Sequence, residues 1–116
     1  MWPRSATELL QLPVQLHGIR LGRPVDLLLD PVEWRALGFV VLCGDESTRF
    51  LVFAAADLRE DAIHVSSALL LLEDVDFYRD RARSLRDLLR GGELLDLLVG
   101  VDGSAEAVES DRVATA

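Results

Sequence analysis

The sequence contains one cysteine, Cys43, and no lysine among its 116 residues. A single cysteine excludes an internal disulfide framework and any zinc site built from several cysteines. Basic residues are also few, since 12 arginines face 20 acidic residues and the formal net charge is -8. This acidic balance argues against broad nucleic-acid binding, which normally requires a basic surface. We attribute the exclusive use of arginine to the codon bias of a GC-rich genome.

Long apolar runs are lacking as well. The longest, residues 36–44, is well short of the ~20 residues that span a bilayer. The N-terminal segment has no apolar core of signal-peptide length, because Glu8 interrupts it, and neither end carries a lipidation signal. We therefore expect a cytoplasmic protein that does not insert into membranes.

Half of the residues, 50%, are hydrophobic, which is far too many for a disordered chain and fits a single folded domain. From residue 14 to residue 72, short apolar runs alternate with turn residues. The runs that predict strands cover residues 14–19, 24–30, 37–43, 49–55, 62–67 and 68–74. Strands of this length and spacing are typical of a small β-barrel or sandwich. Several runs are continuous rather than alternating, so we expect strands buried on both faces under a helix or another copy.

After residue 73 the apolar spacing changes to a helical period. Between residues 76 and 90 the apolar side chains recur on one face, so residues 73–91 are predicted to form one amphipathic helix. Asp74 or Asp76 can cap its start, and two glycines end it. Residues 1–13 are expected to be an N-terminal extension with one short helical turn, capped by Thr7.

The segment after this helix is similar to an earlier part of the same chain. Residues 92–99 (GELLDLLV) match residues 22–29 (GRPVDLLL) in the glycine, the aspartate and a leucine pair. Both segments run into a turn, at Asp30 in one and at Asp102 in the other. We interpret residues 92–116 as a partial second repeat, a short hairpin followed by a tail. A chance match between leucine-rich segments is the alternative.

The order of a glycine, an x-h-D-h-h-h-D strand, a turn and an LGF-V-V strand resembles the start of a PRC-barrel domain. Here these features cover residues 22–30 and 37–42, and residues 14–72 resemble the whole module. The resemblance implies a small β-barrel, found also in the photosynthetic reaction-centre H subunit and in a ribosome-maturation factor. It further implies a docking role without catalytic residues. Two features depart from the family: PVEWRA at residues 31–36 replaces a short glycine turn, and the N-terminal domain of the ribosome factor is lacking.

The residue types that most often carry catalysis form no recognisable set. His17 and His64 are the only histidines, and each lies in a strand pattern without a second ligand at metal-site spacing. Cys43 ends an apolar strand, with no cation near it in the sequence to activate the thiol. Ser66 and Ser67 follow His64, but the G-x-S-x-G elbow is lacking. We therefore predict no enzyme activity, no cofactor, no metal site and no small-molecule substrate.

One charged pattern stands out in the predicted helix. Arg79, Arg83, Arg86 and Arg90 are spaced i, i+4, i+7 and i+11, which places them on one exposed stripe. The stripe is interpreted as a solvated helix face, as a docking ridge for an acidic surface such as that of a second copy, or as a contact to RNA phosphates. Trp34 is a further candidate contact residue, because tryptophan is enriched at binding hot spots. Alternatively, Trp34 caps an open end of its own barrel.

These features together predict a mainly β protein. It would consist of a small PRC-barrel-like β-barrel, one amphipathic C-terminal helix and a short terminal hairpin. The predicted function is a non-enzymatic protein-interaction or scaffold module that binds a protein partner, or a second copy of itself in a homo-oligomer. The alternative is an accessory factor in ribosome or RNA processing that contacts RNA through the helix arginines.

Overall fold

The computed structural model describes residues 2–108. Their strands form two β-sheets. The strands are β1 (Arg4–Ser5), β2 (Val14–Leu16), β3 (Ile19–Leu29), β4 (Ala36–Cys43), β5 (Thr48–Val52), β6 (Asp57–Leu58), β7 (Ile63–His64), β8 (Leu71–Leu72), β9 (Arg83–Ser84), β10 (Asp96–Val99) and β11 (Ala105–Val108). The helices are α1 (Ala6–Leu9), α2 (Val75–Arg79) and α3 (Leu85–Arg90), with 3-10 turns η1 (Phe53–Ala55) and η2 (Ala68–Leu70). The large sheet has the order β6-β7-β2-β3-β4-β5-β8 with β9 beside β3, and the small sheet has the order β1-β10-β11. The prediction of a mainly β protein is confirmed.

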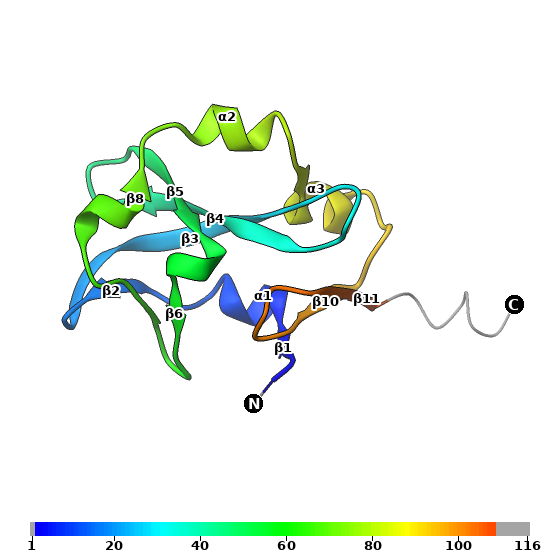
Figure 1. Cartoon of the computed structure of the whole chain (residues 1–116), viewed down its shortest axis with the longest axis horizontal. Helices are drawn as coiled ribbons and strands as arrows, with labels where there is room; N and C mark the ends of the chain where they lie inside the picture. The colour runs from blue at the N-terminus through cyan, green and yellow to red at the C-terminus, as the bar shows by residue number, and fades with distance from the viewer. Residues whose placement is uncertain (1, 109–116) are drawn as a thin grey trace, which may run out of the picture.

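The apolar stretches of the long strands β3, β4 and β5 are buried on both faces, as their continuous apolar runs predict. One face packs in a small cluster formed by Leu28, Val40, Phe50 and Val75, over which α2 lies (Figure 1). The other face belongs to the main core, which includes Leu27, Phe39 and Leu51 together with residues of α1, α3 and β10. Both layers that cover the long strands therefore come from this chain itself.

β3 is one long strand where the sequence predicts two strands with a turn between them. The turn lies earlier, at His17 and Gly18, whose φ angles are 49° and 81°. Positive φ at two successive positions is the geometry of a tight two-residue hairpin turn. The strand then runs through Gly22, where a Cβ atom would overlap the carbonyl oxygen of Leu42 on β4. Gly22 thus permits close strand pairing instead of ending the strand.

The predicted β-barrel is not closed. β6 and β8 form the two ends of the large sheet, and they do not pair with each other within residues 2–108. Each is only two residues long. The predicted strands at residues 49–55 and 68–74 are cut short because η1 and η2 replace part of each run. Closure requires every strand to have a neighbour on both sides, and these short ends leave the sheet open.

The predicted single helix over residues 73–91 is wrong. The chain forms α2, then the short strand β9, then α3. Val75 belongs to the small cluster on one face of the sheet, whereas Leu85 and Leu88 belong to the main core on the other. One straight helix cannot reach both faces. The break also lets Arg83 and Ser84 pair with Leu29 and Leu28 of β3.

Two similar segments, RSATELL at residues 4–10 and RSLRDLL at residues 83–89, occupy similar places in the fold. Each begins as a two-residue strand and continues as a short helix, and the serine side chain caps that helix. The cap of α1 is therefore Ser5 and not Thr7 as predicted. Within the predicted N-terminal extension, Arg4 and Ser5 pair with Val99 and Leu98 of β10.

Each serine also donates a hydrogen bond to the aspartate of one of the two strands that match in sequence, residues 22–29 and 92–99. Ser5 bonds to Asp96 of β10, and Ser84 bonds to Asp26 of β3. In both strands the aspartate also accepts from the next backbone amide, at 2.8 Å for Asp26 and 2.7 Å for Asp96. The two strands that match in sequence thus make matching contacts. The serine at the start of the chain binds the later strand, β10, and the later serine binds the earlier strand, β3.

The two hairpins meet at their turns. Arg35, after β3, and Ser104, before β11, form an isolated antiparallel bridge. Ala36 donates its amide to Gly103 at 2.7 Å, and Ala105 donates its amide to Trp34 at 3.0 Å. These reciprocal bonds relate β3–β4 to β10–β11 by a local two-fold arrangement, in which Ala36 corresponds to Ala105.

Candidate functional site

The four arginines predicted to form one stripe are divided between different elements. Arg79 ends α2, Arg83 lies in β9, and the other two belong to α3. Arg79 pairs with Asp76 at 3.7 Å, and Arg83 pairs with Glu93 at 3.4 Å. The guanidinium of Arg86 reaches the carbonyl oxygen of Val25 at 3.4 Å. Because the helix is interrupted at β9, the spacing that would align these side chains does not apply.

Trp34 lies in the turn between β3 and β4. Its side chain is half-buried and packs against the main core. Its backbone has a φ of 53°, its amide donates to Asp30 at 3.0 Å, and its carbonyl accepts from Ala105. The backbone of Trp34 therefore joins the two hairpins.

The structure brings together His17 and His64, which the sequence gave no reason to link. Their rings meet edge to face with centroids 5.6 Å apart. The Nδ1 atom of His64 lies 4.0 Å from a carboxylate oxygen of Asp57, which itself pairs with Arg59 at 3.0 Å. Within residues 2–108, no group of three or more histidine, cysteine, aspartate or glutamate side chains is placed to hold a metal ion. The pair is explained by packing between the β2–β3 turn and β7.

A groove runs across the end of the large sheet, and η2 forms its centre. We call it the Leu69 groove. On one side of Leu69 is a hollow of about 380 Å³, and on the other is a hollow of about 450 Å³. The two hollows share Arg49, Ala68, Leu69 and Leu71. The first is completed by Leu21, Cys43, Gly44 and Asp45, and the second by Leu72, Glu73, Asp74 and Tyr78.

Leu69 is the most exposed large apolar side chain in the described chain, at 87%. It is held outward because the neighbouring residues are used elsewhere: Leu70 packs against the main core and Leu71 is buried. The side chain of Ser67 fixes this turn by accepting the amide of Leu69 at 3.1 Å. The sequence predicted a strand here, so an outward leucine in the run ALLLL was missed.

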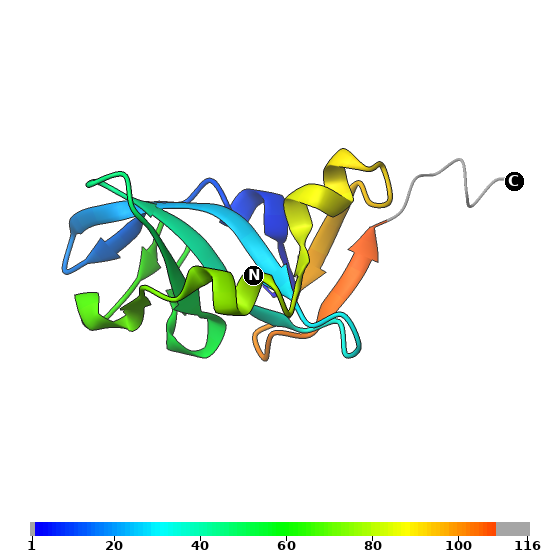
Figure 2. The ribbon, with the colours of Figure 1, turned by 90° about the horizontal axis from the view of Figure 1, so that it is seen from above.

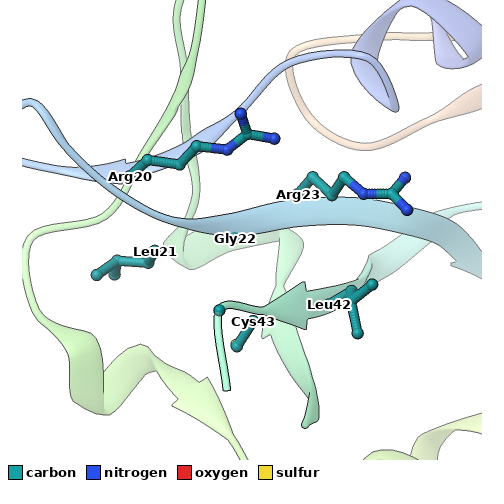
Figure 3. Close-up of a pocket in the computed structure, with 7 residues that line it drawn as sticks. Arg20, Leu21, Gly22, Arg23, Leu42 and Cys43 are labelled. Carbon is teal, nitrogen blue, oxygen red and sulfur yellow. The ribbon is translucent and has the colours of Figure 1, made fainter. Parts of the chain in front are cut away.

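A third hollow, of about 280 Å³, continues the groove past Cys43 to the start of β3. Figure 3 shows the side chains of Arg20 and Arg23 above β3 in this view, and Leu21, Leu42 and Cys43 below it (Figure 3). Both arginines are exposed, and neither forms an ion pair within residues 2–108. They give this rim of the groove a positive charge on a protein whose net charge is -8.

The surroundings of Cys43 in the groove do not activate its thiol. Burial raises the pKa of the Cys43 thiol, and the negative charge of Asp45 raises it further. Hydrogen bonds from the hydroxyl and the amide of Ser47 lower the pKa of Asp45, so this carboxylate stays ionised. A protonated thiol beside a charged carboxylate is a poor nucleophile. The Cys43 thiol is therefore poorly suited to act as a nucleophile.

The groove residues come from β3, β4, β5, η2, β8 and α2, which are far apart in the sequence. The pairing of β3 with β4, of β4 with β5 and of β5 with β8 places them side by side. No spacing rule could have joined them.

In the described part of the chain, no helix is long and apolar enough to span a bilayer. No protein-family model matches the chain, and no curated protein matches it either.

Proposed function

We propose that this chain is a non-enzymatic protein-interaction module, and that the Leu69 groove binds a partner segment rich in apolar and acidic residues. The observation that carries the proposal is the fully outward Leu69 between two hollows, in a groove whose rim holds two arginines that pair with no carboxylate of residues 2–108.

The apolar part of the groove provides the affinity. Burying an exposed leucine side chain in a complex contributes about 1.5–3 kcal/mol to the free energy of binding. Leu69 stands between the hollows, and Leu21, Leu72 and Tyr78 line their outer walls. Two apolar side chains of a partner can enter the hollows on either side of Leu69. A ridge between two hollows is a shape that an extended or helical segment can fit.

The charged part of the groove selects the partner. Arg49 already pairs with Glu73 at 3.2 Å, so the groove arginines that form no ion pair with the described residues are Arg20 and Arg23. Arginine binds carboxylates through two parallel hydrogen bonds, and this geometry favours an aspartate or a glutamate. The rim at Arg20 and Arg23 therefore favours an acidic residue of the partner, whereas Asp45 and Asp74 line the two hollows beside Leu69.

The resemblance of residues 14–72 to the PRC-barrel domain agrees with a docking role, because that domain acts mainly as a docking module. The alternative role in ribosome or RNA processing has less support. It depended on four arginines acting as one stripe, and two of them pair with carboxylates of this chain. A net charge of -8 also repels nucleic acid at long range.

Selection from a random peptide library on the purified protein tests the proposal. We expect the enriched peptides to combine leucine or other large apolar residues with aspartate or glutamate. Synthetic copies should bind the wild-type protein, and Leu69→Asp should weaken binding at least about tenfold, which is ~1.4 kcal/mol. The double variant Arg20→Glu, Arg23→Glu should weaken it similarly.

Val32→Asp is the matched control, since Val32 is equally exposed, at 85%, but lies in the β3–β4 turn outside the groove. Its affinity for the peptides should equal that of the wild type. Enrichment of basic peptides, no enrichment at all, or binding that survives Leu69→Asp would each show that the proposal is wrong.

A further inference from the structure

The second hairpin of the chain lacks a neighbour that the first hairpin has. The reciprocal bonds of Ala36 and Ala105 make β11 the counterpart of β4. On its far side β4 is paired over five residues with β5, starting from Gly38 opposite Val52. Ala107 holds the place of Gly38 in β11, and no described strand pairs with that side of β11.

β11 is also the longest of the four strands at the ends of the two sheets. β1, β6 and β8 have two residues each, whereas β11 has four. Proteins commonly protect edge strands by making them very short or by placing proline or several charges on them. β11 reads Ala-Glu-Ala-Val, so it contains no proline and carries a single charge, that of Glu106. Figure 2 shows it as the outermost strand at one end of the molecule (Figure 2).

The free backbone groups of this edge can be identified. Ala105 donates its amide away from β10, to Trp34, so its backbone groups face outward. Alternate residues of a strand direct their N–H and C=O groups to the same side. Ala107 therefore presents an N–H donor and a C=O acceptor at the open edge, and its side chain is exposed.

We propose that a second copy of this chain occupies the edge, with the two β11 strands paired antiparallel and Ala107 opposite Ala107. In that register the two Ala107 residues exchange both hydrogen bonds across a two-fold axis. Glu106 then lies opposite Val108 of the second copy, so the two carboxylates are not directly opposed. The pairing joins two three-stranded sheets into one continuous sheet of six strands.

A second copy fits this edge better than an unrelated strand because the edge is complementary to itself. The small side chains of Ala105 and Ala107 lie on the same face and leave room for their counterparts. The proposal is independent of the Leu69 groove, whose residues lie in other elements. Each copy carries a charge of -8, so long-range repulsion opposes the dimer and salt should favour it.

Light scattering on a sizing column, at low and high salt and over a range of protein concentrations, tests the dimer. We expect twice the chain mass of 12.8 kDa, with a dimer fraction that increases with salt. Ala107→Glu places two carboxylates directly opposite each other and should give a folded monomer with the circular dichroism spectrum of the wild type. Glu106→Gln is the control and should remain a dimer. Leu69→Asp should also remain a dimer, which separates this proposal from the groove.

Cross-linking gives a second readout that does not require a disrupting charge. In a Cys43→Ser background, Ala107→Cys should form an intermolecular disulfide much faster than Glu106→Cys, because only the first pair is directly opposed. A monomer at every concentration, a dimer that survives Ala107→Glu, or a dimer that dissociates as salt increases would each overturn the proposal.

Discussion

Replacing Asp26 by alanine removes the acceptor that ties β9 and α3 to β3. Asp26 is 8% exposed and is the only buried charged residue in the described chain. It accepts the Ser84 hydroxyl and the backbone amide of Arg86 at 3.1 Å, besides the neighbouring amide of Leu27 at 2.8 Å. In the alanine variant the Arg86 amide, in the first turn of α3, loses its acceptor.

The expected loss follows from the two bonds that join separate elements. Hydrogen bonds to a charged group contribute about 1.5–3 kcal/mol each, so the two together contribute about 3–6 kcal/mol. Removing the carboxylate also removes the cost of burying it, and water can partly replace it. We therefore expect a fall of about 2–4 kcal/mol in the free energy of unfolding.

Urea unfolding followed by circular dichroism measures this loss, and the chain supplies its own control. Asp96 makes the corresponding contacts to Ser5 and Thr7 but is only partly buried, so Asp96→Ala should cost about 1–2 kcal/mol. A double-mutant cycle of Asp26→Ala with Ser84→Ala should give a coupling energy of about 1–2 kcal/mol. Additive effects in that cycle, or a smaller loss for Asp26→Ala than for Asp96→Ala, would refute the reasoning.

Two further predictions concern backbone packing and pH. Gly38→Ala should destabilise the fold by at least about 1–3 kcal/mol in the same urea assay, because the added Cβ overlaps the Leu51 carbonyl of β5; Gly44→Ala, with open space around it, should change stability little. Burial acts to raise the pKa of Asp96, but hydrogen bonds from Ser5, Leu97 and Thr7 lower it below 3.8. Its stabilising effect is therefore present above pH 3.8 and is lost as the pH falls through the lowered value. Stability measured from about pH 5 downward should fall less steeply in Asp96→Asn, and an unchanged slope would contradict this.

The sequence was most informative where one local pattern meets one local requirement. Apolar runs predicted β4 and the first part of β5 closely, because a strand buried on both faces needs apolar side chains at every position. The helical period after residue 73 predicted one helix, where the structure has α2, β9 and α3. It missed the break, although the Ser84-x-x-Asp87 spacing resembles the start of a capped helix.

The match between residues 22–29 and 92–99 identified two strands that carry the same aspartate. It did not show that Asp26 binds Ser84 and Asp96 binds Ser5. These contacts depend on the pairing of β9 with β3 and of β1 with β10. The open sheet has a similar cause. Whether β6 and β8 meet depends on the lengths of two short end strands, which η1 and η2 limit.

The sequence by itself determined the composition of the core, the mainly β character and the two similar halves, because burial and strand geometry act on neighbouring residues. Only the tertiary structure decided which surfaces remain open. It placed α2 and α3 on opposite faces of the sheet, and it separated the four arginines that the sequence predicted to form one stripe. It also turned Leu69 outward between two hollows and left β11 without a second described neighbour. These outcomes depend on contacts between residues far apart in the chain, where no local spacing applies.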